Sequence, residues 1–254
     1  MWRIPEDDTA PVLTAAEQLS SAHRGCSYRL PDVAVVYFMS GAADAVRANC
    51  ACTQYPEDFP RFLNRCPIWR LNDAEVCFLN GGAGAPQAAD TIETLAALGV
   101  KTVLSVGLIG AFSRQLRVGE IIAPRRAFVE EGASLHYYER IASASPDTEL
   151  LWQLSSRYGW QTCPIVTTDA IYRQTFMKEQ LWREQGAVGV DMETSAVFSV
   201  SKYLGLRAAA MLMASDQHPQ ASGEPRWAWH MTDALREDMA EKSISFARGL
   251  AEKA

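Results

Sequence analysis

Short apolar runs alternate with stretches of helical periodicity along most of the chain. The apolar runs have the length of buried strands, and the periodic stretches repeat apolar residues every three or four positions. We predict strands at 33–38, 68–71, 74–79, 102–106, 118–124, 165–168, 187–190 and 208–214. We predict helices at 42–51, 88–98, 146–158, 177–185, 194–204 and 231–251. This alternation is typical of a single α/β domain with a mixed, mostly parallel central sheet flanked by helices.

The first 30 residues lack this alternation. Within them, Thr14-Ala-Ala-Glu17 has the pattern of a capping box and predicts a short helix that ends near His23. We interpret residues 1–30 as an N-terminal extension and residues 31–254 as one α/β domain.

Two apolar runs late in the chain end on acidic residues. Asp191, Met192 and Glu193 follow one run, and Asp216 follows the next. In open α/β sheets, ligands bind beyond the carboxyl ends of the strands. We therefore expect Glu193 and Asp216 at one rim of the sheet, as a binding or catalytic pair. The alternative is structural, since Asp191 or Thr194 can cap the following helix and Asp216 can cap a turn.

Two glycine-rich segments follow predicted strands. The first, Gly81-Gly-Ala-Gly-Ala-Pro86, lacks the spacing of a dinucleotide-binding loop and is interpreted as a tight strand-to-helix turn. The second, Gly107-Leu-Ile-Gly110, is expected to be a turn after the strand at 102–106.

The composition narrows the functional class. A net charge of -6 argues against nucleic acid as a partner, and no apolar run reaches the length of a membrane span. The acidic N-terminus lacks the apolar core of a signal peptide, and the six cysteines show no metal-ligand or redox spacing. We expect a cytoplasmic protein with reduced cysteines, no bound metal and no cofactor.

Several motifs together resemble the nucleoside phosphorylase superfamily, which includes purine nucleoside phosphorylases, uridine phosphorylases and methylthioadenosine nucleosidases. The similarity covers about residues 33–250. The motifs occur in family order, and they are the Gly-x-Gly-x-Pro turn at 82–86, Leu-Arg-Val-Gly-Glu-Ile-Ile at 116–122, Gly-Ala-Ser-Leu-His at 132–136, Thr-Thr-Asp-Ala-Ile-Tyr at 167–172, Val-Asp-Met-Glu-Thr-Ser-Ala at 190–196 and Ser-Asp at 215–216.

The resemblance implies a role for each acidic residue. Met192 is expected to pack against the sugar, and Glu193 to hydrogen-bond its hydroxyls. Asp216 matches the acid that contacts or protonates the base in purine-specific members. These residue types suit cleavage of an N-glycosidic bond, because the sugar becomes oxocarbenium-like and the base leaves as an anion.

The remaining substrate contacts are implied in the same way. Gly107 and Gly110 are expected to line the glycosidic region. Ile171 takes the place of an aromatic residue that stacks on the base, with Tyr172 beside it. His136 is expected either in the wall of the site or in a structural role. His218 is expected in a solvated loop, and the alternative is a place in a loop beside the base.

The phosphate site departs from the family pattern. The turn at Gly41 has Ala45 where an arginine is expected, and Arg47 is the nearest substitute. Ser105 replaces a second arginine, and Leu108 replaces a hydroxyl residue. Because a phosphate dianion needs charge-assisted donors, phosphate binding is expected to be weakened or rebuilt.

Family members are dimers or trimers of dimers whose sites are completed by a neighbouring subunit. Arg65 is the candidate for the arginine given to a neighbour, and His23 for the histidine that reaches a neighbour's ribose. The resemblance therefore implies a homo-oligomer.

The expected activity is phosphorolysis of a nucleoside, with phosphate as co-substrate. Asp216 favours purine nucleosides, whereas Gly-Ala-Ser-Leu-His at 132–136 points to the uridine branch. Hydrolysis by water is the alternative, because phosphate ligands are missing. A weakly catalytic nucleoside-binding protein is a third hypothesis, and the presence of both Glu193 and Asp216 argues against it.

Overall fold

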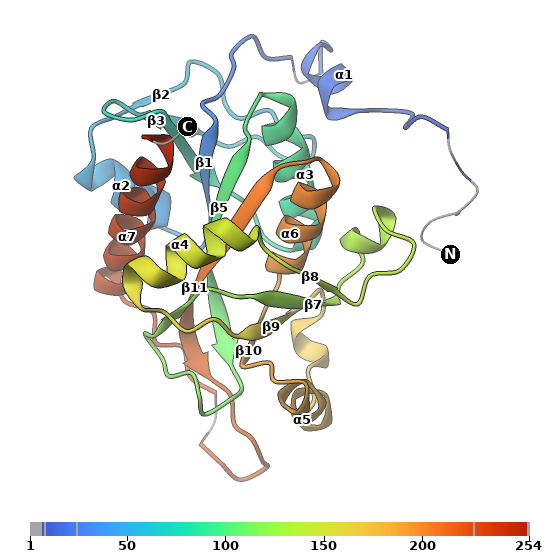
Figure 1. Ribbon diagram of the computed structural model, residues 1–254, viewed down its shortest axis with the longest axis vertical. Coiled ribbons are helices and arrows are strands. Elements are labelled where there is room, and N and C mark those ends of the chain that lie inside the picture. Colours follow the sequence, from blue (N-terminus) through green and yellow to red (C-terminus); the bar gives the residue numbers. More distant parts are fainter. Residues whose placement is uncertain (1–6, 8, 24, 226, 253–254) are drawn as a thin grey trace.

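The apolar runs form one mixed sheet in the computed structural model, which describes residues 7, 9–23, 25–225 and 227–252 (Figure 1). Nine strands follow one another across it in the order β2-β3-β4-β1-β5-β10-β9-β7-β8, while β11 pairs with β5 and β6. Their bounds are β1 (Val33–Phe38), β2 (Cys52–Gln54), β3 (Ile68–Leu71), β4 (Val76–Asn80), β5 (Thr102–Ala111), β6 (Ile121–Ile122), β7 (Arg126–Glu130), β8 (Ser143–Ala144), β9 (Pro164–Thr168), β10 (Gly189–Asp191) and β11 (Arg207–Gln217).

Helices cover both faces of the sheet, as Figure 1 shows. The α-helices are α1 (Ala15–Leu19), α2 (Ala42–Asn49), α3 (Ala85–Ala97), α4 (Thr148–Tyr158), α5 (Phe176–Glu184), α6 (Thr194–Tyr203) and α7 (Asp233–Ala251), and the 3₁₀-helices are η1 (Ala133–His136) and η2 (Ile171–Arg173). Alternate residues of β1 point to opposite faces: Ala34 and Val36 enter the core under α3 and α6, and Val35 and Tyr37 enter the core under α2, α4 and α7. The α/β fold class is therefore confirmed.

Strand β5 joins two halves of the sheet that run in opposite directions. Strands β1 and β11 lie parallel to β5, and β4 lies parallel to β1. On the other side, β10 runs antiparallel to β5 and parallel to β9, which is parallel to β7. Strands β10 and β11 run in opposite directions beside β5, so Glu193 and Asp216 do not follow two parallel strands.

The segment Gly107–Gly110 is not a turn. It lies within β5, where Gly110 is paired with Val190 of β10 and with Asp216 of β11. Because both edges of this segment are hydrogen-bonded to neighbouring strands, it continues as strand in spite of its glycines. β11 likewise continues past Ala214 to Gln217, with a β-bulge between Ala214 and Asp216.

Two other element ends differ from the sequence predictions. The capping box at Thr14 and Glu17 forms, but α1 ends at Leu19 rather than near His23. The carbonyl of Leu19 accepts a hydrogen bond from the N–H of Cys26. The strand expected at 118–124 shortens to β6, because Gly119 adopts φ +84° in a turn. The hairpin of β3 and β4 forms as expected. No helix in the described part of the chain is long and apolar enough to cross a membrane.

Candidate active site

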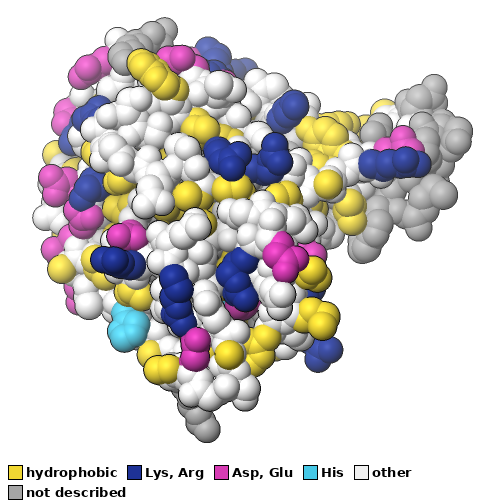
Figure 2. Space-filling view, turned by 60° about the horizontal axis from the view of Figure 1, so that its bottom comes forward, with side chains coloured by type: hydrophobic (Ala, Val, Ile, Leu, Met, Phe, Trp, Pro, Cys, Tyr) yellow, Lys and Arg dark blue, Asp and Glu magenta, His cyan; other side chains and the backbone are white. Residues whose placement is uncertain are grey.

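The two acidic motifs converge on the glycine-rich part of β5. Val190 and Asp216 pair with Gly110 from its two sides, and beyond Val190 the chain runs back along β5 toward Gly107. The carboxyl ends of β5 and β11 point to the lower end of the molecule in Figure 1. Viewed from that side, hydrophobic side chains are interspersed with Lys and Arg side chains (Figure 2). We take this region as the candidate site.

Glu193 is partly buried at the start of α6. Its Oε1 accepts a hydrogen bond from the N–H of Gly84 at 2.7 Å, and Gly84 is the N-cap of α3. The carboxylate therefore faces the positive end of α3 as well as that of its own helix. Burial and the nearby charge of Asp191 nevertheless raise the pKa of Glu193 above its ordinary value. This environment suits a carboxylate held for a ligand, because its charge is poorly solvated.

Asp191 caps helix α6, which is the structural role that the sequence offered as the alternative to a functional one. Its Oδ2 accepts hydrogen bonds from the N–H of Thr194, at 2.9 Å, and from the Thr194 hydroxyl. Its Oδ1 accepts a hydrogen bond from the hydroxyl of Thr167 on β9 at 2.6 Å. The side chain thus caps α6 and ties it to β9, while Glu193 makes no capping bond to its own helix.

Asp216 is 4% exposed, and both of its carboxylate oxygens are occupied. Ser215 Oγ donates to Oδ1 at 2.6 Å, and Trp227 Nε1 donates to Oδ2 at 2.5 Å. His218 Nε2 lies 3.1 Å from the same Oδ2. Burial alone would raise the pKa of Asp216, but the hydrogen bonds from His218, Ser215 and Trp227 lower it below its ordinary value. Asp216 is therefore ionised at neutral pH.

His218 is not in a solvated loop, contrary to expectation. It lies between two buried carboxylates, with Nδ1 2.7 Å from Oε1 of Glu179 on α5 and Nε2 facing Asp216. Burial lowers the pKa of His218, but the hydrogen bonds and charges of Asp216 and Glu179 outweigh it and raise that pKa to about 9. The sequence signal was spacing, because residues two apart along a strand point to the same side.

Position 110 has room only for glycine, because the side chains of His218 and Asp216 lie against it. A Cβ at this position would lie 2.6 Å from His218 Nε2 and 3.2 Å from Asp216 Oδ2. Any other residue would therefore push the imidazole away from Asp216. Gly110 therefore lies directly beside His218 and Asp216.

The other substrate-contact candidates lie on the surface of the chain. Ile171 and Tyr172 of η2 are 45% and 92% exposed, and His136 at the end of η1 is also exposed. Both 3₁₀-helices follow strands of the β7–β9–β10 half, and the N–H of Gly132 donates to Asp169 Oδ2 at 2.8 Å, which joins the two segments. Met192 is half-buried beside Glu193. Their contacts with substrate remain predictions.

The turn after β1 has an arginine beside it that the sequence reasoning missed. Gly41 is the N-cap of α2 with φ +79°, and the Arg236 side chain from the first turn of α7 packs against it. Arg236 Nε donates to the carbonyl of Ser40 at 3.0 Å, and its Nη1 pairs with Asp233. A guanidinium thus lies at the Gly41 turn, although it comes from the far end of the sequence.

The arginines proposed from the sequence have other partners. Arg47 pairs with Asp44 at 3.0 Å and lies over the ring of Trp69, 5.1 Å from its centroid. Arg65 Nη2 donates to the carbonyl of His23 at 3.4 Å, so these two candidates for a neighbour's site lie together.

The two residues that replace phosphate ligands in β5 are enclosed by the fold. Ser105 is buried in mid-sheet, where it is paired with Val36 and Ala210. Leu108 packs against the core under α2, α4 and α7. Neither position offers a cationic group to a phosphate.

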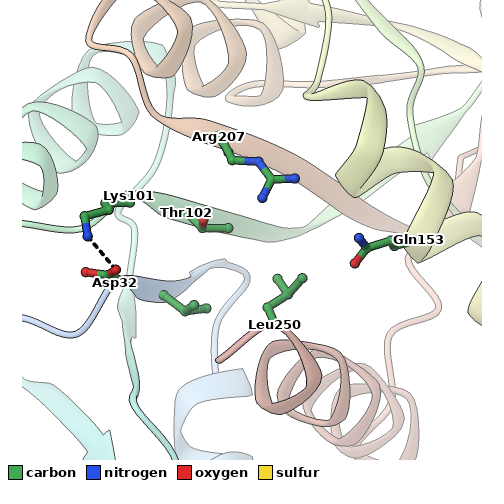
Figure 3. Close-up of a pocket in the computed structure, with 7 residues that line it drawn as sticks. Asp32, Lys101, Thr102, Gln153, Arg207 and Leu250 are labelled. Carbon is green, nitrogen blue, oxygen red and sulfur yellow. Dashed lines mark hydrogen bonds and ion pairs between the residues drawn. The ribbon is translucent and has the colours of Figure 1, made fainter. Parts of the chain in front are cut away.

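A separate cavity lies at the opposite end of the sheet, at the amino ends of β1, β5 and β11. It has a volume of about 230 Å³, and Figure 3 shows Asp32, Thr102 and Arg207 among its lining residues. Its charged side chains are paired, Lys101 with Asp32 at 2.7 Å and Arg207 with Asp147 at 3.1 Å. Across the described residues, no three His, Cys, Asp or Glu side chains gather in a way that could hold a metal ion.

Comparisons with known proteins show the family to which the chain belongs. The chain is 31% identical over 144 residues to a guanosine phosphorylase of Halorubrum lacusprofundi, and 27% identical over 160 residues to a uridine phosphorylase of Haemophilus influenzae. These matches cover 55% and 54% of this chain, and 59% and 62% of the relatives, which is less than two thirds of their length.

A solved structure has the same fold. The crystal structure of a purine nucleoside phosphorylase from Toxoplasma gondii in complex with immucillin-H superposes with a TM-score of 0.73 at 17% identity, and the match covers 89% of this chain and 93% of the other. The family model described as "Phosphorylase superfamily" matches residues 32–252. Because that match includes almost the whole chain, this protein belongs to the phosphorylase superfamily.

Proposed function

We propose that this protein cleaves the N-glycosidic bond of a purine nucleoside by phosphorolysis, giving the free base and ribose 1-phosphate. The observation that carries the proposal is the pairing of two strands with the Gly107–Gly110 segment of β5: β10, which leads into Glu193, and β11, which contains Asp216. Glu193 is then available to the sugar and Asp216 to the base. The glycines of the strand segment between them, Gly107 and Gly110, have no side chains that could block a substrate.

The reaction needs charge stabilisation at two places. As the bond from C1′ to the base breaks, the sugar gains positive charge and the base takes the electron pair. Glu193 binds the ribose hydroxyls and favours the positive charge, with Met192 packed against the ring. Asp216 faces the base, and a phosphate oxygen attacks C1′ from the opposite side. A base can reach Asp216 only when Trp227 gives up its hydrogen bond to Oδ2.

Asp216 is the reason for proposing purine nucleosides. A purine offers N7 as a hydrogen-bonding partner for this acid or for its proton, and a pyrimidine has no equivalent atom. The relatives include both a guanosine and a uridine phosphorylase, so they support nucleosides in general rather than purines.

Arg236 is the proposed phosphate ligand. It lies at the Gly41 turn, and the N-terminal end of α2, which has no side-chain cap, adds to the attraction for an anion. Hydrolysis is the second candidate function, because Ser105 and Leu108 leave the β5 side of the phosphate site without cations.

We also propose that the protein is a homo-oligomer whose sites are completed by a neighbour. The side chains of Phe176, Met177 and Leu181 lie exposed on α5, the helix whose Glu179 contacts His218, and Tyr172 lies exposed on the preceding η2. Exposed apolar surface of this kind is typical of protein interfaces.

The deciding experiment is cleavage of inosine, guanosine, adenosine and uridine with and without phosphate, with identification of the sugar product. We expect ribose 1-phosphate, formed only with phosphate, and faster turnover of at least one purine nucleoside than of uridine. Free ribose formed without phosphate would establish the hydrolase instead. Turnover fastest with uridine would contradict the purine preference.

A further inference from the structure

The His218 imidazole forms a three-membered chain with two acids from different elements. Asp216 on β11 contacts Nε2 at 3.1 Å, and Glu179 on α5 contacts Nδ1 at 2.7 Å. The three side chains are 5%, 15% and 7% exposed for Asp216, His218 and Glu179. The chain therefore runs from the candidate site to the interior side of α5, almost without solvent contact.

This arrangement holds a proton that the site needs. Two ionised carboxylates this close in the interior would repel each other unless a cation lies between them, because desolvation of each charge is costly. An imidazolium that donates from both nitrogens satisfies both acids. Asp216, meanwhile, is ionised and has no proton of its own to give, so the proton for a departing base has to come from a neighbour.

We propose that His218 supplies, through Asp216, the proton taken up by the departing base, and that Glu179 holds the imidazole in place and keeps it protonated. The inference rests on the proposed function. His218 and Glu179 act through Asp216, which faces the base, so both are positioning residues rather than catalytic ones.

In the proposed step, one bond breaks and one proton moves from His218 to the base. The bond from C1′ to N9 breaks and its electron pair goes to the purine. His218 Nε2 transfers its proton to Oδ2 of the ionised Asp216, and the carboxyl group so formed passes that proton to N7 of the purine. The step leaves a neutral base, an ionised Asp216 and a neutral imidazole, which recovers its proton from solvent after the base has left.

The surroundings of His218 favour the charged imidazole. The ionisable groups that face it are Asp216 from β11 and Glu179 from α5, and Arg183 of α5 lies 3.9 Å from Glu179. From β5, Gly110 packs against the ring and adds no charge. Burial opposes protonation, yet the two acids raise the pKa of His218 to about 9. The proton is therefore present at neutral pH and is lost as the pH rises through about 9.

The test compares Glu179→Gln with Glu184→Gln, an exposed glutamate on the same helix. Each variant is assayed on inosine and on a nitrophenyl riboside, whose leaving group needs no proton. We expect Glu179→Gln to lose inosine turnover and to move the alkaline limb of its pH profile down by about one to three units, since it removes one charge in contact with His218. Turnover of the nitrophenyl riboside and the Glu184→Gln control should change little.

A measurement without substrate separates this inference from the proposed function. The His218 imidazole is titrated by NMR in the wild-type protein and in both variants, with the melting temperature as a check on folding. A lower His218 pKa in Glu179→Gln alone supports the assignment. An unchanged pKa, or equal losses on inosine and the nitrophenyl riboside, overturns it. If the wild-type protein cleaves neither substrate, the proposed function fails, and the NMR titration still decides whether Glu179 holds the proton.

Discussion

At the scale of single residues, Asp191 and Glu193 look equivalent in the sequence but have different roles in the structure. They lie two positions apart and are both acidic, but Asp191 has its oxygens filled by Thr167 and Thr194. Glu193 makes its hydrogen bond to Gly84, which belongs to a turn 109 residues away. A group that costs free energy to bury and does not cap its own helix is better explained by a ligand than by the fold.

Glu193→Gln should therefore remove activity without removing stability. The variant keeps an acceptor for the Gly84 N–H and loses the charge. We expect turnover to fall by about tenfold to a thousandfold, within the range of single electrostatic contributions to catalysis. Steady-state kinetics with a saturating nucleoside measures the loss.

The pH dependence of stability gives the matching control. Because the pKa of Glu193 is higher in the folded than in the unfolded protein, its contribution to stability is present at low pH and is lost as pH rises through the folded value. Glu193→Gln avoids that loss, so its melting temperature at pH 8 should equal or exceed that of the wild type. A variant that melts earlier at pH 8, or that keeps full activity, would show that Glu193 serves the fold.

At the scale of elements, the proposed phosphate site depends on where α7 begins. Thr232 caps this helix, and its first turn brings Arg236 to the turn between β1 and α2. Arg47, on α2 itself, is closer to that turn in sequence but pairs with Asp44 and Trp69. Proximity along the chain is thus a poor guide to which arginine lies beside the Gly41 turn.

Arg236→Met should weaken phosphate binding, whereas Arg47→Met should not. A charge-assisted hydrogen bond contributes about 1.5–3 kcal/mol, so we expect the phosphate KM to rise about tenfold to a hundredfold in Arg236→Met. The nucleoside KM should change less in the same variant. Phosphate saturation curves for both variants make the comparison, and a larger effect in Arg47→Met would move the site to α2.

Sequence-based prediction succeeded for features set by local patterns and failed for features set by contacts between distant segments. Periodicity, with the capping box at Thr14 for α1, located the seven α-helices and eight of the eleven strands of the described residues, because nearly all of these bury a local apolar pattern. It missed the short or partly exposed strands β2, β7 and β8, whose residues show no such pattern. It failed at Gly107–Gly110, since glycines form a strand there only through pairing with β10 and β11, which lie far away in sequence. The β-bulge before Asp216 and the contact of His218 with Glu179 also depend on residues far apart in sequence, so a local pattern could not predict them.

At the scale of the whole molecule, α5 has two different faces. Its buried face places Glu179 against His218, and its outer face presents Phe176, Met177 and Leu181 to solvent. A neighbouring subunit bound to that outer face would fix the position of α5 and, through Glu179, the position of His218. Assembly and proton supply are then connected by one helix.

The double variant Met177→Glu, Leu181→Glu should therefore separate the subunits and reduce activity together. The two side chains are 72% and 51% exposed, so charge there should leave the isolated chain folded while making an apolar contact unfavourable. Sedimentation velocity measures the assembly state, and inosine turnover is followed in the same samples. Gln180→Glu, an exposed position on the same helix, is the control and should keep both the oligomer and the activity. A wild-type protein that sediments as a monomer, or a charged double variant that remains assembled, would exclude this face as the interface.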